Sequence, residues 1–171
     1  MYTTFIADDE LIIRQGLRCI LDWEELGFQI IGEAANGADA LDFIIKNNPD
    51  LVLLDIRMPQ ILGTEIVRRA KEQGFTGKFI ILSGFTDFEY TQAAHYGVDY
   101  YLTKPIDEDA LLETVKNIAL QLDTSKHQQE IFLEYKRKAH DMILHDILIG
   151  HDIPTAPDNF DYYPKADCYQ V

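Results

Sequence analysis

The sequence is poor in cysteine, tryptophan and basic side chains, and it contains no long hydrophobic run. Its two cysteines, Cys19 and Cys168, lie far apart and fit neither a metal-site spacing nor a disulfide framework. No apolar run approaches the ~18 residues that a membrane span requires. The first residues lead directly into acidic ones, so we expect no secretory signal peptide. These absences predict a protein of the reducing cytoplasm with no membrane partner.

Basic residues are far fewer than acidic ones: the chain has 15 Lys and Arg side chains and 29 Asp and Glu side chains. The resulting net charge is −14. Affinity for nucleic acids depends largely on Lys and Arg displacing the counterions of phosphates. We therefore predict that this chain does not bind nucleic acid by itself.

Residues 1–120 alternate short apolar runs with amphipathic stretches. The apolar runs have four or five residues, which is too short for buried helices, so we expect strands. Three of them are apolar almost throughout, as strands covered on both faces must be. The five expected strands are Thr4–Ala7, Phe28–Ile31, Leu51–Leu54, Phe79–Leu82 and Val98–Leu102.

Five helices are expected to follow these strands in turn. Their signals are an apolar stripe over 11–20, a cap at Asn36, a helix over 63–73, a capping box at 86–89 and a cap at Asp107. Strands that alternate with helices favour a parallel sheet with helices on both faces. The sequence thus predicts an α/β fold with a doubly wound five-stranded parallel sheet.

The pattern changes from about Gln121. We expect residues 1–122 to form the α/β domain, residues 123–149 a helical extension or linker, and residues 150–171 a linker and the truncated start of a following module. A heptad-like apolar series in the extension is interrupted at Ser125 and Asp146. A coiled coil with a second copy and a helix packed on its own domain both remain open. We expect the chain to be a fragment of a longer protein.

Polar residues follow four of the expected strands: Asp8–Glu10, Asp55, Ser83–Gly84 and Lys104–Pro105. Because the carboxyl ends of parallel strands meet at one edge of a sheet, these residues are expected to converge on one pocket. Grouped carboxylates repel one another unless a cation neutralises them, and oxygen ligands of this kind suit Mg²⁺. Asp55 is the candidate nucleophile, and the Ser83 hydroxyl and the Lys104 ammonium could stabilise an incoming phosphoryl group.

Over about residues 3–122 the sequence resembles the receiver domains of response regulators, from bacterial two-component systems. The resemblance rests on Asp8–Asp9, on Asp55–Pro59, on Ser83 and on Tyr101–Pro105. It implies a flavodoxin-like receiver fold in which Asp55 takes a phosphoryl group from the phosphohistidine of a sensor histidine kinase.

The resemblance also implies a role for each residue that matches the family's motifs. Mg²⁺ would be bound by Asp9, by Asp55 and by the backbone carbonyl of Arg57, with Asp8 contributing through water. Ser83 and Lys104 would contact the phosphoryl group, Tyr101 would be the switch aromatic, and the peptide bond before Pro105 would be cis. After Pro59, Ile61-Leu62-Gly63 replaces the family's Met-Asp-Gly, which alters the flank of a loop but no site residue.

Two longer stretches, 21–37 and 83–102, are similar to the subgroup whose full-length members end in an AraC-type DNA-binding domain. The similarity implies an output domain in cis that this chain lacks, and a homodimer on phosphorylation is a further expected partner.

Two alternatives stay open: a stand-alone receiver that acts through protein–protein contacts, and a haloacid-dehalogenase-type phosphatase. The phosphatase also combines an Asp nucleophile, Ser or Thr, Lys and Mg²⁺. Its nucleophile follows the first strand and its acidic pair comes last, whereas here the acidic pair comes first. We therefore predict a phosphoacceptor that assists its own phosphotransfer and dephosphorylation, and not a multi-turnover enzyme.

Overall fold

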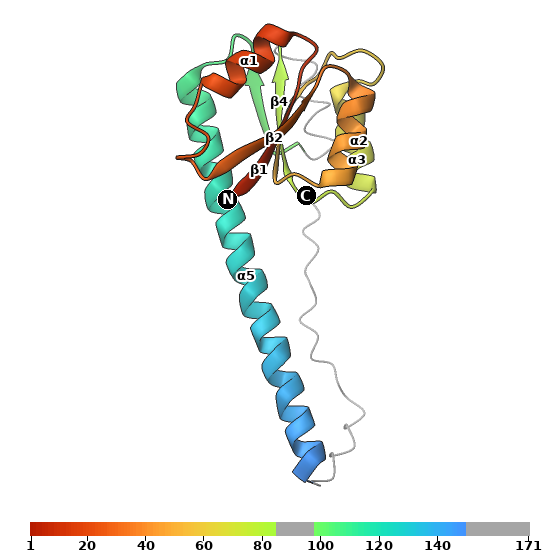
Figure 1. Cartoon of the computed structure of the whole chain (residues 1–171), viewed down its shortest axis with the longest axis vertical. Coiled ribbons are helices and arrows are strands. Elements are labelled where there is room, and N and C mark those ends of the chain that lie inside the picture. The colour runs from red at the N-terminus through yellow and green to blue at the C-terminus, as the bar shows by residue number, and fades with distance from the viewer. Residues whose placement is uncertain (85–97, 150–171) are drawn as a thin grey trace, which may run out of the picture. The chain divides into compact units, whose positions relative to one another are not determined.

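The computed structural model describes residues 1–84 and 98–149 of the chain (Figure 1). The chain divides into two compact units, Met1–Thr124 and Ser125–Val171. The strands of the first unit are β1 (Tyr2–Ala7), β2 (Phe28–Ala34), β3 (Leu51–Asp55), β4 (Lys78–Ser83) and β5 (Tyr100–Thr103). They form one sheet in the order β2-β1-β3-β4-β5, with every neighbouring pair parallel. The predicted fold class is confirmed.

The described helices are α1 (Leu11–Cys19), α2 (Gly37–Asn47), α3 (Gly63–Glu72) and α5 (Glu108–Ile149). Two predicted caps are present, since the Asn36 side chain accepts a hydrogen bond from the Asp39 amide at 2.9 Å and Asp107 accepts one from the Ala110 amide at 2.9 Å. The capping box expected at 86–89 lies outside the described residues. Strand β5 begins at Tyr100, two residues after the predicted start.

Alternate residues of the strands point to opposite faces of the sheet and build two hydrophobic cores. Phe5 and Ala7 belong to the core that also contains residues of α2 and α3. Ile6, between them, belongs to the core that contains Leu17 of α1 and Val115 of α5. Figure 1 shows the corresponding layers, with α2 and α3 on one side of the sheet and α1 and α5 on the other. Helices on both sides of the sheet explain the long apolar runs within the central strands β1, β3 and β4.

Helix α5 is one continuous helix of 42 residues. The change of pattern at Gln121 reflects a change of environment and no break in the helix, since neither glycine nor proline occurs between residues 108 and 149. Leu111, Val115 and Ile118 are fully buried in the first unit. In the second unit the helix carries exposed large hydrophobic side chains, at Ile131, Phe132, Leu133 and Tyr135. Among the described residues, no helix is both long and apolar enough to cross a membrane.

Two glycines position the segment that follows β3. The Gly63 amide donates to the Ile56 carbonyl at 2.9 Å, and a Cβ at Gly63 would collide with the backbone carbonyl of Asp55. The Gly37 amide donates to the Pro59 carbonyl at 3.0 Å, and a Cβ there would collide with the Ile61 carbonyl. Only residues without a side chain allow these approaches, so both glycines bring α2 and α3 against the loop beyond Asp55.

The start of α3 shows the consequence of the departure from the family's Met-Asp-Gly. Leu62 occupies the N-cap position and makes no side-chain hydrogen bond to the first turn. The Leu62 side chain is exposed instead. Helix α3 therefore begins without the cap that Asp provides at this position.

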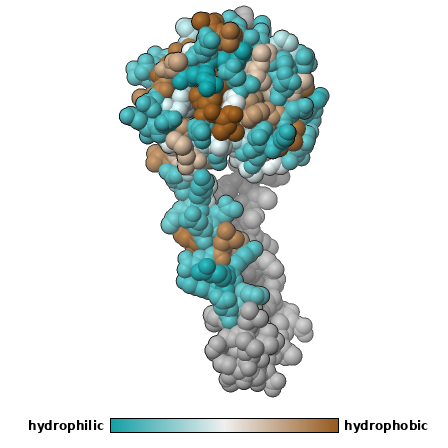
Figure 2. Space-filling model, viewed as in Figure 1, coloured by the Kyte–Doolittle hydropathy of each residue, from teal (hydrophilic) through white to brown (hydrophobic). Residues whose placement is uncertain are grey.

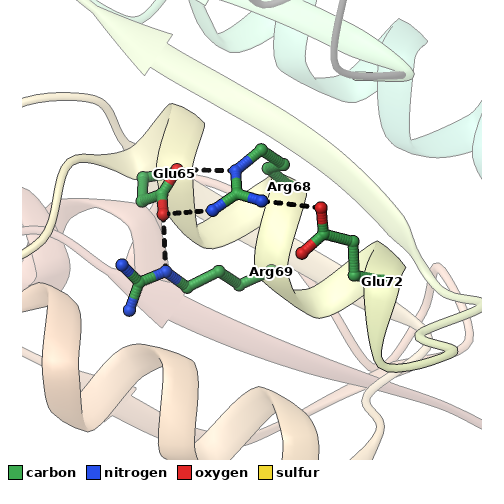
Figure 3. A network of polar contacts seen from close by, with 4 residues as sticks. All are labelled: Glu65, Arg68, Arg69 and Glu72. Atoms are coloured by element: carbon green, nitrogen blue, oxygen red, sulfur yellow. Dashed lines mark hydrogen bonds and ion pairs between the residues drawn. The ribbon is translucent and has the colours of Figure 1, made fainter.

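The surface of the first unit is mostly hydrophilic in the space-filling view, with hydrophobic side chains gathered in small patches (Figure 2). Helix α3 carries an ionic network on its outer face (Figure 3). The Arg68 guanidinium donates to Glu65 at 2.8 Å and to Glu72 at 2.6 Å, and Arg69 donates to Glu65 at 2.6 Å. These partners lie three or four residues apart, the spacing at which side chains of one helix meet.

Candidate functional site

The acidic residues that follow β1 and β3 lie side by side because these two strands are neighbours. Ala7 of β1 is paired with Leu54 of β3, so Asp8 and Asp55 come next at the same edge of the sheet. Carboxylate oxygens of Asp8, Asp9 and Asp55 all lie within 4.8 Å of one another. The predicted approach of the acidic pair to Asp55 is therefore present.

Lys104 joins this cluster from the other side, since β5 pairs with β4 and Ser83 lies opposite Thr103. The Lys104 ammonium lies 2.7 Å from Asp8 Oδ2 and 2.9 Å from Asp55 Oδ1. Its backbone amide donates to the Ser83 carbonyl at 2.7 Å, which ties the end of β5 to the end of β4. The Lys104–Pro105 peptide bond is cis.

A cavity of about 270 Å³ opens above the cluster. Its lining consists of Asp9, Glu10, Asp55, Arg57, Ser83, Gly84 and Lys104. Asp8 is fully buried beneath it, whereas Asp9 is exposed. A larger cavity of about 440 Å³, beside Trp23 and Phe28, shares none of these residues. The strand-end residues from four strands thus share one solvent-accessible pocket.

The electrostatics of the pocket are unbalanced. Burial raises the pKa of Asp55 above its usual value, against the opposing effect of the hydrogen bond from Lys104. Burial alone would lower the pKa of Lys104, but hydrogen bonds to Asp8 and Asp55 outweigh it and the pKa is raised. Lys104 is therefore a fixed cation, and one ammonium faces three carboxylates.

The donor set fits a hard divalent cation. Carboxylate oxygens within reach of one another, in a pocket open to water, are the ligands that Mg²⁺ prefers. Two backbone amides orient the carboxylates, because Arg57 donates to Asp55 Oδ2 at 3.0 Å and Glu10 donates to Asp8 Oδ1 at 2.9 Å. Asp8, Asp9, Glu10 and Asp55 stand against Lys104 and Arg57 at this pocket, a formal excess of two negative charges that a divalent cation would offset.

Comparison with known proteins agrees with this geometry. Residues 4–116 match the response regulator receiver domain, which covers more than half of the chain. The chain belongs to the response regulator receiver family. Receiver domains of transcriptional response regulators do not act as conventional enzymes, so the phosphatase alternative is not supported.

Relatives of this receiver include transcription regulators. The transcriptional regulatory protein YesN of Bacillus subtilis is 39% identical over 123 residues, which make up 71% of this chain and 33% of YesN. The chain therefore spans only about a third of the length of this relative.

Solved structures are also similar to this chain in fold and sequence. The receiver domain of AraT, a response regulator of Geobacillus stearothermophilus, is 33% identical with a TM-score of 0.68, covering 73% of this chain and 98% of that one. A Borrelia burgdorferi CheX–CheY complex with beryllium fluoride and Mg²⁺ is 26% identical with a TM-score of 0.62, covering 68% and 88%.

The remaining predicted residue of this receiver, Tyr101, lies outside the lining of the cavity. It is half-buried on β5 and packs against the hydrophobic core on the α2 and α3 side. Ile81 of β4 lies opposite Tyr101, two residues before Ser83. Tyr101 and Ser83 thus lie on neighbouring paired strands, β5 and β4.

Some residues that support the site were not predicted. Gly37 and Gly63 were passed over, as was Arg14, whose guanidinium donates to the carbonyls of Asp8 and Asp9 at 2.7 and 3.4 Å. One signal could have identified Arg14: it precedes Leu17 by three residues, so a basic side chain lies on the same face of the helix as a buried leucine.

Proposed function

We propose that this receiver domain is a phosphorylation-dependent signalling switch, in which Asp55 accepts a phosphoryl group from the phosphohistidine of a sensor histidine kinase. The observation that carries the proposal is the position of the Asp55 carboxylate. It lines an open acidic cavity, 2.9 Å from the Lys104 ammonium and beside the carboxylates of Asp8 and Asp9.

In the proposed transfer, an Asp55 carboxylate oxygen forms a bond to phosphorus while the phosphorus–nitrogen bond of the donor breaks, and its electron pair returns to the imidazole ring. The hydrogen bond from the Arg57 amide to Oδ2 fixes the carboxylate plane. Lys104 and Ser83 line the same cavity, and their ammonium and hydroxyl would interact with the phosphoryl oxygens, over which charge is spread in the transition state.

Asp9, Asp55 and the backbone carbonyl of Arg57 would bind Mg²⁺, with Asp8 contributing through water. The bound ion would offset the carboxylates and supply positive charge to the phosphoryl oxygens. The Mg²⁺ in the CheY complex named above supports this assignment by relationship.

Phosphorylation replaces the single negative charge of the Asp55 carboxylate with an acyl phosphate of about two negative charges, so it adds roughly −1 unit of charge to the pocket. We propose that Ser83 moves towards the phosphoryl group and that Tyr101 turns into the space it leaves. Because β5 is paired with β4 and continues into the segment before α5, this change can reach helix α5 and a transcriptional output domain in cis. We place this switch in the cytoplasm, where the kinase domain of a sensor would meet it.

The homodimer and the domain division remain proposals as well. We propose a receiver over 1–122, a helical extension over 123–149 and a linker to a further module over 150–171.

Exposed Phe132 and Tyr135 on the extension support pairing of two copies after phosphorylation. Sedimentation with and without beryllofluoride tests it, and an unchanged monomer would favour a stand-alone receiver that acts through other protein contacts.

Replacement of the proposed nucleophile tests the function directly. Asp55→Asn should abolish labelling by acetyl phosphate in the presence of Mg²⁺, because an amide cannot form the acyl phosphate. Intact-mass measurement would detect the added phosphoryl group. Asp42→Asn, at an exposed position of α2, is the matched control and should label like the unaltered chain. Equal labelling of Asp55→Asn would refute the proposal.

A further inference from the structure

Arg14 is the one basic side chain that is buried among the residues whose exposure is described. Only 8% of the residue is exposed, and the other buried charged residues are Asp8 and Asp55 of the pocket. It lies on the inner face of α1 with Leu17. Burial of a charged group is unfavourable unless it is hydrogen-bonded, so we expect the buried guanidinium to have specific partners.

The hydrogen bonds of Arg14 lead directly to the acidic pair. Its Nη1 atom donates to the backbone carbonyl of Asp8 at 2.7 Å and to that of Asp9 at 3.4 Å. Helix α1 begins after these residues with Glu10 at the N-cap and no side-chain cap. Arg14 therefore restrains the peptide units from which both carboxylates project.

The rest of the guanidinium is bound more loosely. Nε lies 3.6 Å from a Glu33 carboxylate oxygen of β2 and has no hydrogen-bond partner. Arg18 approaches the other oxygen of Glu33 at the same distance, but its side chain is 47% exposed. Both arginines therefore approach Glu33, whereas the hydrogen bonds to the carbonyls of Asp8 and Asp9 come from Arg14.

We propose that Arg14 is a positioning residue of the cation site. By holding the two carbonyls, it directs the Asp9 carboxylate to the cavity and leaves the Asp8 carboxylate paired with Lys104. The inference rests on the proposed function, because it takes the acidic pair as ligands of Mg²⁺. Residues that orient metal ligands from behind are known to control affinity as strongly as some ligands do.

Positioning and simple charge predict opposite results. Removal of a nearby positive charge would strengthen binding of a cation by Coulomb's law. Loss of the restraint on Asp8 and Asp9 would weaken it. The sign of the change in Mg²⁺ affinity therefore separates the two effects.

The experiment titrates Mg²⁺ alone into the full chain and three variants, and follows the backbone amide signals of Glu10 and Arg57 by NMR. Arg14→Met, which keeps the apolar stem, should raise the Mg²⁺ dissociation constant by about 10-fold. Arg14→Lys should give a smaller loss, since one ammonium can reach one carbonyl. Arg18→Met is the matched control and should stay within about twofold, because it touches neither carbonyl.

Each outcome has a distinct meaning. An Arg14→Met affinity equal to or tighter than that of Arg18→Met would overturn the positioning role and leave the phosphoryl-transfer proposal intact. Failure of the unaltered chain to bind Mg²⁺ would instead overturn the proposed function. If Arg14→Met does not fold, Arg14→Lys carries the test together with amide hydrogen exchange at Asp9 and Glu10. Faster exchange with weaker binding supports the role, and no change in either overturns it.

Discussion

Two ionic clusters in the first unit differ in composition and in surroundings. The cluster at the carboxyl edge of the sheet gathers the carboxylates of Asp8, Asp9 and Asp55, of which Asp8 and Asp55 are buried and paired with Lys104. The cluster on the outer face of α3 joins Glu65 and Glu72 to Arg68 and Arg69 at the surface (Figure 3). The first has an excess of negative charge, and the second is balanced.

The pKa values of the acidic members shift in opposite directions. Burial raises the pKa of Asp55. Hydrogen bonds from Arg68 and Arg69 lower the pKa of Glu65 to about 2. A balanced exposed network stabilises a helix modestly and needs nothing further. A cluster of buried carboxylates with an excess of negative charge is instead the kind of environment in which ligand-binding sites are found.

Removal of one cation from each cluster should produce the largest contrast. Lys104→Met should lower the free energy of unfolding by about 3 kcal/mol without Mg²⁺, because it removes the ammonium that is paired with the buried carboxylates of Asp8 and Asp55. Arg68→Met should have a smaller effect, since water surrounds its partners. Urea denaturation measures both. An equal decrease in the free energy of unfolding for both variants would contradict the distinction between the buried and the exposed cluster.

Magnesium should act on one cluster only. At ten times its dissociation constant, Mg²⁺ should stabilise the folded chain by about 1.4 kcal/mol and raise the melting temperature accordingly. Asp9→Asn should lose much of this response, and Glu72→Gln should keep it. EDTA should reverse the stabilisation. A similar response in the Asp9 and Glu72 variants would place the ion elsewhere.

Acid should reveal the smallest effect, at the α3 network. Glu65 has a pKa of about 2 in the folded chain, below its ordinary value of 4.5, so its contribution to stability is present above pH 4.5 and is lost as the pH falls towards 2. The stability difference between the unaltered chain and Glu65→Gln should therefore shrink over that range, as measured by urea denaturation. Asp55 has the opposite sign, since its raised pKa makes stability fall as the pH rises. Added salt should reduce the Glu65 effect more, because exposed charges are screened.

Much of the fold could be predicted because its signals are local. The apolar run Leu51–Leu54 is a buried strand, and Asn36 and Asp107 cap helices as their side-chain chemistry predicts. The continuity of α5 was harder to see. Its buried first part and its exposed later part have different compositions, although the same backbone hydrogen bonds continue through both.

The sequence predicts most residues of the candidate site, but it does not predict all of the contacts between them. Asp8, Asp55, Ser83 and Lys104 each lie at or directly after the carboxyl end of a strand, so the topology of a parallel sheet brings them to one edge. Arg14 carries no such signal, because it lies within a helix and follows no strand. Nothing local shows that its guanidinium reaches back to the carbonyls of Asp8 and Asp9.

By itself the sequence determined the alternation of strands and helices, the α/β class and the set of polar residues at the strand ends, since these depend on side-chain periodicity over a few residues. Only the tertiary structure decided that β1 lies between β2 and β3, that Lys104 bridges Asp8 and Asp55, and that Arg14 supports the acidic pair. Those contacts join residues up to 96 positions apart. They form because burial of both faces of the sheet selects one strand order, and no local pattern encodes that choice.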